Sequence, residues 1–238
     1  MLSRMKAKLD GGRSLLYTTS RYVDVYKALE DIQRERPLTA EERAELKKYS
    51  RLADAFTPMC KGMTSEYANQ NAYDSVSVHG GSGFIMEYKC QRLFRDARIF
   101  SIYEGTTQLQ VVAAIRYIIN GTWQGIFEEM LGHEVSEQMK PLQARISALL
   151  PTYLAAIEKV KADADQEEQD FLSRRLYDMT GVLVISLLLL DDASKAPELF
   201  AKSAEVYVRH AEAEVSAHSA YVMNFKAEDL ASFRVAED

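Results

Sequence analysis

Apolar residues recur every three or four positions along most of this chain, and this periodicity constrains the fold more than any other feature. It is the spacing of one face of an α-helix, whereas the alternating β-branched runs that would indicate strands are absent. The chain has only 11 Gly and 5 Pro among 238 residues, so long helices are permitted. The sequence therefore predicts an all-α protein built as an antiparallel helical bundle followed by a second helical unit.

The first two expected helices are long. Apolar positions predict one helix from Leu2 to about Leu29, ended by Pro37. Gly11 and Gly12 are a weak point in it, since a glycine costs about 1 kcal/mol inside a helix, and close approach of a neighbouring helix is one reason to tolerate them. A capping box at residues 39–42 opens the second helix, which should kink at Pro58 and end near residue 78.

Shorter elements follow in the first half. A glycine-rich turn is expected at residues 80–83, a short helix at 88–96, and a longer helix at 106–120 with Gly121 just beyond its end. We place a domain boundary here, with residues 1–121 as the first unit and 122–238 as the second.

The second unit should contain three or four antiparallel helices. They are expected at residues 126–150, with Pro151 kinking or restarting the element, at 171–190, and from Pro197 to about 224. Turns are expected at 161–169 and 191–195. The apolar run at 182–190 is too short to span a membrane and indicates a buried helix. Trp123, the only tryptophan, should anchor the junction between the two halves.

Charge is unevenly distributed along the chain. Residues 1–120 hold 18 Lys and Arg against 14 Asp and Glu, and the remainder holds 11 against 21. This acidic second half argues against nucleic acid as a partner. Cys60 and Cys90 indicate reduced, buried thiols in an intracellular protein, and residues 1–10 show no secretory signal pattern, so we expect a cytoplasmic location.

One carboxylate stands out as a candidate catalytic base. Glu104 precedes Gly105 at a break in the pattern, just before a regular apolar helix. An apolar setting would raise its basicity, and Gly105 would let a flat substrate approach the backbone closely. The alternative is a helix N-terminal acid stabilised by the macrodipole.

The residues around this carboxylate also have two interpretations. Thr106, Gln108 and Gln110 could offer donors to an electron-rich ligand at the helix start, or be an N-cap and a solvated face. The glycine turn could approach a phosphate or simply reverse the chain. The arginines at 92, 95 and 98 could steer an anion, although we favour ion pairing for Arg95. The four histidines have no metal-ligand spacing, so no metal site is expected.

Three segments together carry a family resemblance. They are Val-Ser-Val-His-Gly-Gly-Ser-Gly-Phe at 76–84, Arg-Asp-Ala-Arg-Ile at 95–99 and Ile-Tyr-Glu-Gly-Thr at 102–106. In this combination, residues 1–120 resemble the C-terminal helical domain of the acyl-CoA dehydrogenases. Residues 122–238 resemble the helical C-terminal extension of the longer members.

This resemblance implies an activity and a set of site residues. The family dehydrogenates an acyl-CoA thioester to the trans-2-enoyl-CoA, with a glutamate removing the α-proton while hydride leaves for FAD. The motif implies Glu104 as that base, Tyr103 and Gly105 beside the substrate, Thr106 and Gln108 against FAD, and Gly80 and Gly81 against FAD held mainly by a neighbouring subunit. It also implies an electron-transfer flavoprotein as partner and a homo-oligomer.

The chain departs from the family in two ways. Ser77 stands where glutamine is usual, and the regions that carry most of the flavin and acyl-chain site are missing. We therefore expect a C-terminal portion of such an enzyme that is inactive alone. The alternative is a non-catalytic helical oligomerisation or interaction module derived from the same fold. A DNA-associated relative is disfavoured, because it should show a basic face.

Overall fold

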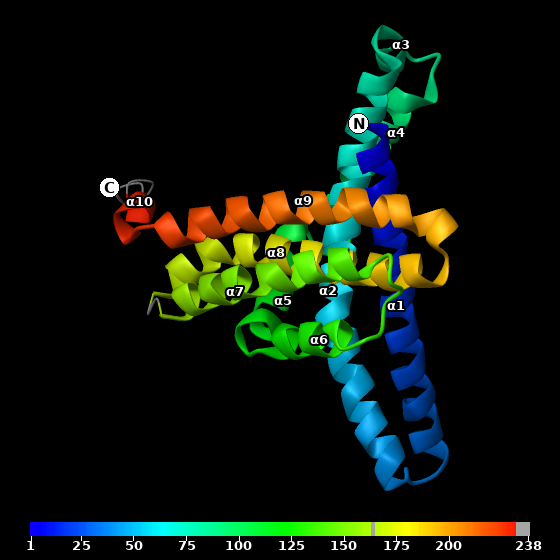
Figure 1. Cartoon of the computed structure of the whole chain (residues 1–238), viewed down its shortest axis with the longest axis vertical. Helices are drawn as coiled ribbons and strands as arrows, with labels where there is room; N and C mark the ends of the chain where they lie inside the picture. Colours follow the sequence, from blue (N-terminus) through cyan, green and yellow to red (C-terminus); the bar gives the residue numbers. More distant parts are fainter. Residues whose placement is uncertain (163–164, 232–238) are drawn as a thin grey trace.

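The computed structural model describes residues 1–162 and 165–231, and every regular element in these ranges is a helix. Helix α1 (Leu2–Glu35) and helix α2 (Ala40–His79) form a long hairpin, and α7, α8 and α9 cross it near its middle (Figure 1). The prediction of an all-α fold is confirmed. The remaining elements are α3 (Gly81–Phe84), α4 (Lys89–Ala97), the 3-10 helix η1 (Arg98–Ser101), α5 (Thr107–Ile119), α6 (Thr122–Leu131), α7 (Lys140–Ala162), α8 (Gln166–Lys195), α9 (Pro197–Asn224) and α10 (Ala227–Ala231).

The tip of the hairpin is fixed by the predicted capping box. The Thr39 hydroxyl accepts from the Glu42 amide at 3.2 Å, and the Glu42 carboxylate accepts from the Thr39 amide at 2.8 Å. Arg36 donates to the same carboxylate, and this ion pair, helped by the Thr39 amide, lowers the pKa of Glu42 to about 2. A local sequence signal therefore sets the start of α2.

Helix α8 forms the centre of the core. Its residues 182–190 are all buried, as the apolar run predicted, and it packs against α1, α5, α7 and α9. A Cβ added to Gly11 of α1 would lie 2.4 Å from Cγ2 of Ile185, so only glycine allows α1 and α8 to come this close. Close approach of a neighbouring helix, one reason for a glycine in this helix, is thus found at Gly11.

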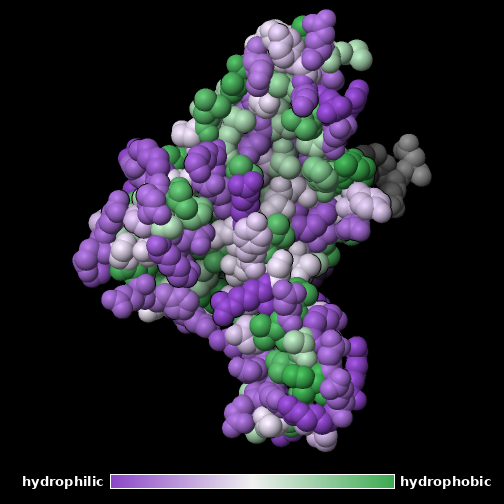
Figure 2. All heavy atoms as spheres, turned by 90° about the vertical axis from the view of Figure 1, so that its right-hand side faces the viewer, coloured by the Kyte–Doolittle hydropathy of each residue, from purple (hydrophilic) through white to green (hydrophobic). Residues whose placement is uncertain are grey.

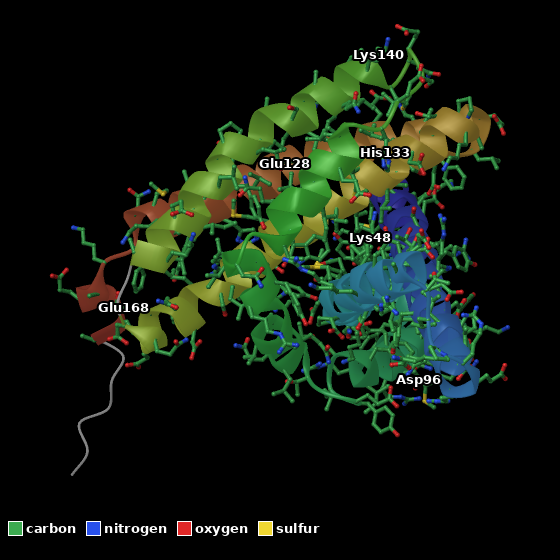
Figure 3. The ribbon with its side chains drawn as sticks, turned by 90° about the horizontal axis from the view of Figure 1, so that it is seen from below. Lys48, Asp96, Glu128, His133, Lys140 and Glu168 are labelled. Carbon is green, nitrogen blue, oxygen red and sulfur yellow. The ribbon has the colours of Figure 1, made fainter. Side chains whose placement is uncertain are left out.

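Trp123 connects α6 to the hairpin. Its side chain is fully buried, with ring centroids 4.8 Å from Phe56 of α2 and 5.8 Å from Phe127 of α6. Lys48 of α2 also pairs with Glu129 of α6 at 2.9 Å. Figure 3 shows the segment bearing Glu128 and His133 lying over the part of α2 that carries Lys48. One hydrophobic cluster contains residues of both halves. The division into two domains at residues 1–121 and 122–238 therefore stays a prediction.

Two predicted elements in the second half are wrong. The single helix at 126–150 is instead α6 and α7, separated by residues 132–139. Gln143 of α7 donates to the carbonyls of Leu131 and His133 and so satisfies the end of α6, a contact invisible in the periodicity. The turn expected at 191–195 is the last part of α8, which continues until Ala196 because the restriction imposed by Pro197 acts there.

Other boundaries agree with the prediction or refine it. Helix α9 begins at Pro197 as expected, and α2 and α7 continue through Pro58 and Pro151. Residues 81–84 form the short helix α3 where a turn was expected. The turn expected at 161–169 lies partly outside the described residues. None of the described helices combines the length and hydropathy needed to cross a bilayer.

Candidate functional site

The segment that carries Glu104 lies between η1 and α5. Helix α4 passes directly into η1, whose last residue Ser101 is buried and bonded to the Arg98 guanidinium. The amides of Ile102 and Tyr103 then both donate to the Ile99 carbonyl at 2.9 Å. The chain turns at residues 103–105 and enters α5, so a compact loop holds the candidate base close to a helix start.

The backbone of Glu104 is left-handed. Its φ of 54° is the only positive value at a non-glycine residue in the described part of the chain, and Gly105 follows with φ 90°. A left-handed residue with a Cβ costs about 1–2 kcal/mol, and such conformations concentrate at functional sites. A Cβ on Gly105 would also lie 2.8 Å from Nε2 of Gln110. The geometry of this turn therefore favours glycine at 105, whereas Glu104 adopts its conformation at a cost.

The surroundings of Glu104 differ from the expected apolar environment. The Glu104 side chain is exposed, and Ile102 and Tyr103 are 46% and 68% exposed. These apolar neighbours lie at the surface beside the carboxylate and do not bury it. Burial that would raise its basicity must therefore come from groups outside the described chain.

Thr106 and Gln108 lie at the start of α5. The Thr106 hydroxyl accepts from the Leu109 amide at 3.3 Å, so Thr106 is the helix N-cap, which was the structural alternative for this residue. Both side chains are exposed and lie next to Glu104 in the chain. Gln110 points back to the loop, with its Nε2 3.4 Å from the carbonyls of Glu104 and Gly105.

The glycine turn lies far from this loop. Gly80 has φ 60° and links the end of α2 to α3, and a Cβ at Gly80 or Gly81 would meet nothing within 4 Å. Lys61, which contacts Gly105, precedes Gly80 by 19 residues of the same helix, or about 28 Å at the α-helical rise. The structure therefore does not bring the glycine turn and Glu104 together within one chain.

Sequence reasoning missed two residues of α2 that contact the loop. Lys61 donates to the Gly105 carbonyl at 2.5 Å and to the Phe100 carbonyl at 2.8 Å. The Glu66 carboxylate accepts from the buried hydroxyl of Thr107 at 2.6 Å. These partners are separated by about 40 positions, and neither residue belongs to a motif, so no local signal reveals them.

Many large apolar side chains are exposed between the end of α2 and the start of α5. Figure 2 shows hydrophobic side chains on the upper arm of the molecule, where α3 lies in Figure 1. Exposed apolar surface of this kind can mark an interaction or ligand site. Its most exposed members include Tyr73, Phe84, Met86, Leu93, Phe100, Tyr103 and Leu109.

The histidines, cysteines and arginines take the following positions. His210 and His218 of α9 lie 3.6 and 3.3 Å from the Glu214 carboxylate, while Nδ1 of His79 lies 2.9 Å from the Ser75 carbonyl. Within residues 1–162 and 165–231, no group of three His, Cys, Asp or Glu side chains could hold a metal ion. Cys60 and Cys90 are buried free thiols, as predicted. The ion pairing expected of Arg95 is wrong, because it forms none among the described residues.

Comparison with known proteins assigns this arrangement to one class. Residues 34–118 match the family model "Acyl-CoA dehydrogenase, C-terminal domain", and residues 119–230 match "Acyl-CoA dehydrogenase C terminal". The chain belongs to the acyl-CoA dehydrogenase family and comprises its C-terminal helical domain followed by the C-terminal extension.

Particular relatives cover only part of the chain. It is 38% identical over 110 residues to the 3-methylmercaptopropionyl-CoA dehydrogenase of Ruegeria pomeroyi, which is 46% of this chain and 17% of that protein. It is 32% identical over 110 residues to the caffeyl-CoA reductase-Etf complex subunit CarC of Acetobacterium woodii, which is 46% and 23%. The chain thus spans about a fifth of the length of these relatives.

Solved structures extend the similarity to the whole fold. An acyl-CoA dehydrogenase of Bacillus anthracis, complexed with FAD, superposes with a TM-score of 0.68 at 20% identity, over 97% of this chain and 42% of that one. The Caenorhabditis elegans protein ACDH-11, in complex with C11-CoA, gives 0.58 at 18% identity, over 84% and 33%. At these identities the structures establish a shared fold.

Proposed function

We propose that this chain is the C-terminal portion of an FAD-dependent acyl-CoA dehydrogenase, and that Glu104 is its catalytic base. The observation that supports this most directly is the left-handed Glu104 in the Ile-Tyr-Glu-Gly-Thr loop. Strain at a carboxylate that is also exposed needs a reason other than packing. Removal of a proton from a bound substrate provides that reason.

Each residue of the loop has its own role in the proposed reaction. Glu104 takes the proton from the carbon next to the thioester carbonyl, with Tyr103 and Gly105 beside the acyl group. FAD, when bound, would accept the hydride that leaves the β-carbon. Thr106 and Gln108 follow Glu104 by two and four residues at the start of α5, where exposed side chains can contact the flavin.

The residues present fit a flavin that is shared between subunits. The backbone at Gly80 and Gly81 is open, with no atom within 4 Å of an added Cβ, so a phosphate can approach it. Its separation of about 28 Å along α2 from the Glu104 loop favours contact with a second cofactor, held mainly by a neighbouring subunit. This arrangement requires a homo-oligomer in the complete enzyme.

The remainder of the site must come from outside this chain. The exposed Glu104 and the apolar surface around it need cover from groups that this chain does not supply, and the chain spans 42% of the superposed FAD-containing structure. We therefore propose that the chain alone is inactive. Reoxidation by an electron-transfer flavoprotein is consistent with the name of the Acetobacterium woodii relative, a subunit of an Etf complex.

Flavin binding tests this proposal. We define the completed dehydrogenase as this chain joined behind the part of the Ruegeria pomeroyi relative that precedes its own C-terminal region. After purification with added FAD and gel filtration, the visible spectrum of the completed dehydrogenase should show bound flavin, and this chain alone should not oxidise acyl-CoA. A folded, helical completed protein that elutes without flavin would overturn the proposal and favour the non-catalytic interaction module.

A further inference from the structure

The strained turn at Glu104 must be held by its surroundings. A left-handed backbone is unfavourable for a residue with a Cβ, and it persists only where neighbouring contacts determine it. Glu104 itself is exposed, so packing of its own side chain does not hold it. The contacts that fix the turn must therefore act on the backbone of the loop.

Lys61 of α2 makes the strongest of these contacts. Its ammonium donates to the Phe100 carbonyl at 2.8 Å and to the Gly105 carbonyl at 2.5 Å. These two carbonyls lie at the two ends of the segment that contains Glu104. Because the donor is charged, both bonds are stronger than neutral ones, and together they fix the distance between the ends of the loop.

Gln110 supports the turn more weakly. Its Nε2 lies 3.4 Å from the carbonyls of Glu104 and Gly105, which is longer than the usual N–H···O distance of about 2.9 Å. The amide is also neutral. Of the two side chains that bond to the carbonyls of the turn, Lys61 is thus the stronger restraint.

The turn of α2 that carries Lys61 is in direct contact with α8. The hydroxyl of Tyr177 in α8 donates to the carbonyls of Pro58 and Met59, which lie three and two residues before Lys61. A Cβ on Gly62 would lie 2.0 Å from that hydroxyl, so α8 is in direct contact with this turn of α2. The C-terminal extension therefore fixes the position from which Lys61 reaches the loop.

We propose that Lys61 is a positioning residue for Glu104. It holds residues 100–105 in the one shape that aims the carboxylate, with its own position set by Tyr177 of the extension. The catalytic consequence rests on the proposed function of Glu104, whereas the ordering of the loop is a property of this chain and is measured separately.

Hydrogen exchange of the 238-residue chain measures the ordering. The Ile102 and Tyr103 amides, bonded to the Ile99 carbonyl, report on the loop. In Lys61→Met they should exchange about tenfold faster or more, because a hydrogen bond from a charged donor is lost. Lys47→Met, at an exposed site on the same helix, should leave both rates unchanged. Equal loop exchange in both variants, with unchanged helix protection, would overturn the proposal.

Kinetics of the completed dehydrogenase test the consequence. Lys61→Met should lower kcat roughly tenfold to a hundredfold, with KM for acyl-CoA and bound FAD unchanged, because misplacement of the base costs rate and not binding. Lys61→Arg, which keeps a charged donor, should recover part of the loss. A raised KM at constant kcat would contradict positioning. A completed dehydrogenase with no turnover even without the substitution would defeat the role of Glu104. If Lys61→Met still speeds exchange of the loop amides, the assignment of Lys61 to the loop stands.

Discussion

The Tyr177 hydroxyl of α8 lies 3.0 Å from the Pro58 carbonyl of α2, and it donates to that carbonyl and to Met59 from a fully buried position. Proline at 58 cannot donate within its helix, so this part of α2 is where the regular bonding pattern is interrupted. The carbonyl left without its helical donor is that of Asp54, whereas Tyr177 of the extension bonds the carbonyls of Pro58 and Met59, just before Lys61. The extension is therefore part of the structure that supports the Glu104 loop.

The contact between Gly62 and Tyr177 predicts a destabilising substitution. In Gly62→Ala the new Cβ would lie 2.0 Å from the hydroxyl, so α2 and α8 must separate or Tyr177 must lose its bonds. We expect a loss of about 1–3 kcal/mol in the free energy of unfolding, measured by urea denaturation. Gly125→Ala in α6, where nothing lies within 4 Å, is the matched control and should be neutral or gain up to about 1 kcal/mol. Equal midpoints for both variants would contradict the close packing of α8 on α2.

The environment of His210 predicts a pH dependence of stability. Burial lowers its pKa from the ordinary 6.5, Lys8 and Arg4 lower it further, and Glu214 acts against them. The Tyr207 ring packs edge-on against the imidazole. The unfolded chain therefore binds this proton more readily than the folded one. The stability due to the neutral ring is complete above about pH 6.5 and is lost as the pH falls below it.

Urea midpoints at about pH 7.5 and about pH 5.5 check this prediction. The wild-type midpoint should fall at the lower pH, and His210→Gln should reduce that fall. His133→Gln, at an exposed site, is the control and should keep the wild-type difference. If His210→Gln shows the full difference, then another group controls the acid sensitivity.

The shared core predicts that the first half depends on the second. Leu15 of α1, Phe56 of α2 and Val111 of α5 belong to one cluster with the buried residues of α8. A chain truncated after Gly121 would expose this surface to water, at a cost of about 25 cal/mol for each Å² of apolar area. We expect loss of cooperative thermal unfolding by circular dichroism and aggregation on gel filtration. A monomeric fragment with an unchanged melting temperature would show that the extension is an independent appendage.

Local signals in the sequence predicted the elements that depend on neighbouring residues. The capping box at Thr39, the start of α9 at Pro197 and the buried run of α8 each follow from chemistry within a few positions. The break between α6 and α7 falls at Gly132, a local stop signal that the apolar periodicity does not register, and Gln143 of the next helix donates to the Leu131 carbonyl there. Periodicity alone continues through such a break.

The candidate site was only partly accessible to sequence reasoning. Glu104 could be proposed because the Glu-Gly pair and the following helix are local, and the family motif surrounds it. Lys61, Glu66 and Tyr177 could not, because each acts across a distance of at least 39 positions through tertiary packing. The exposure of Glu104 was also not predictable, since it depends on which surfaces this chain leaves uncovered.

Reduction of bound flavin by acyl-CoA in the completed dehydrogenase tests the central claim most directly. Under anaerobic conditions, acyl-CoA should bleach the visible absorbance of the wild-type flavin. Glu104→Gln should retain the same amount of bound FAD. Its flavin should be reduced roughly 10²–10⁴-fold more slowly, which is the usual contribution of a positioned base. Near-normal bleaching of Glu104→Gln would contradict the assignment of Glu104 as the base.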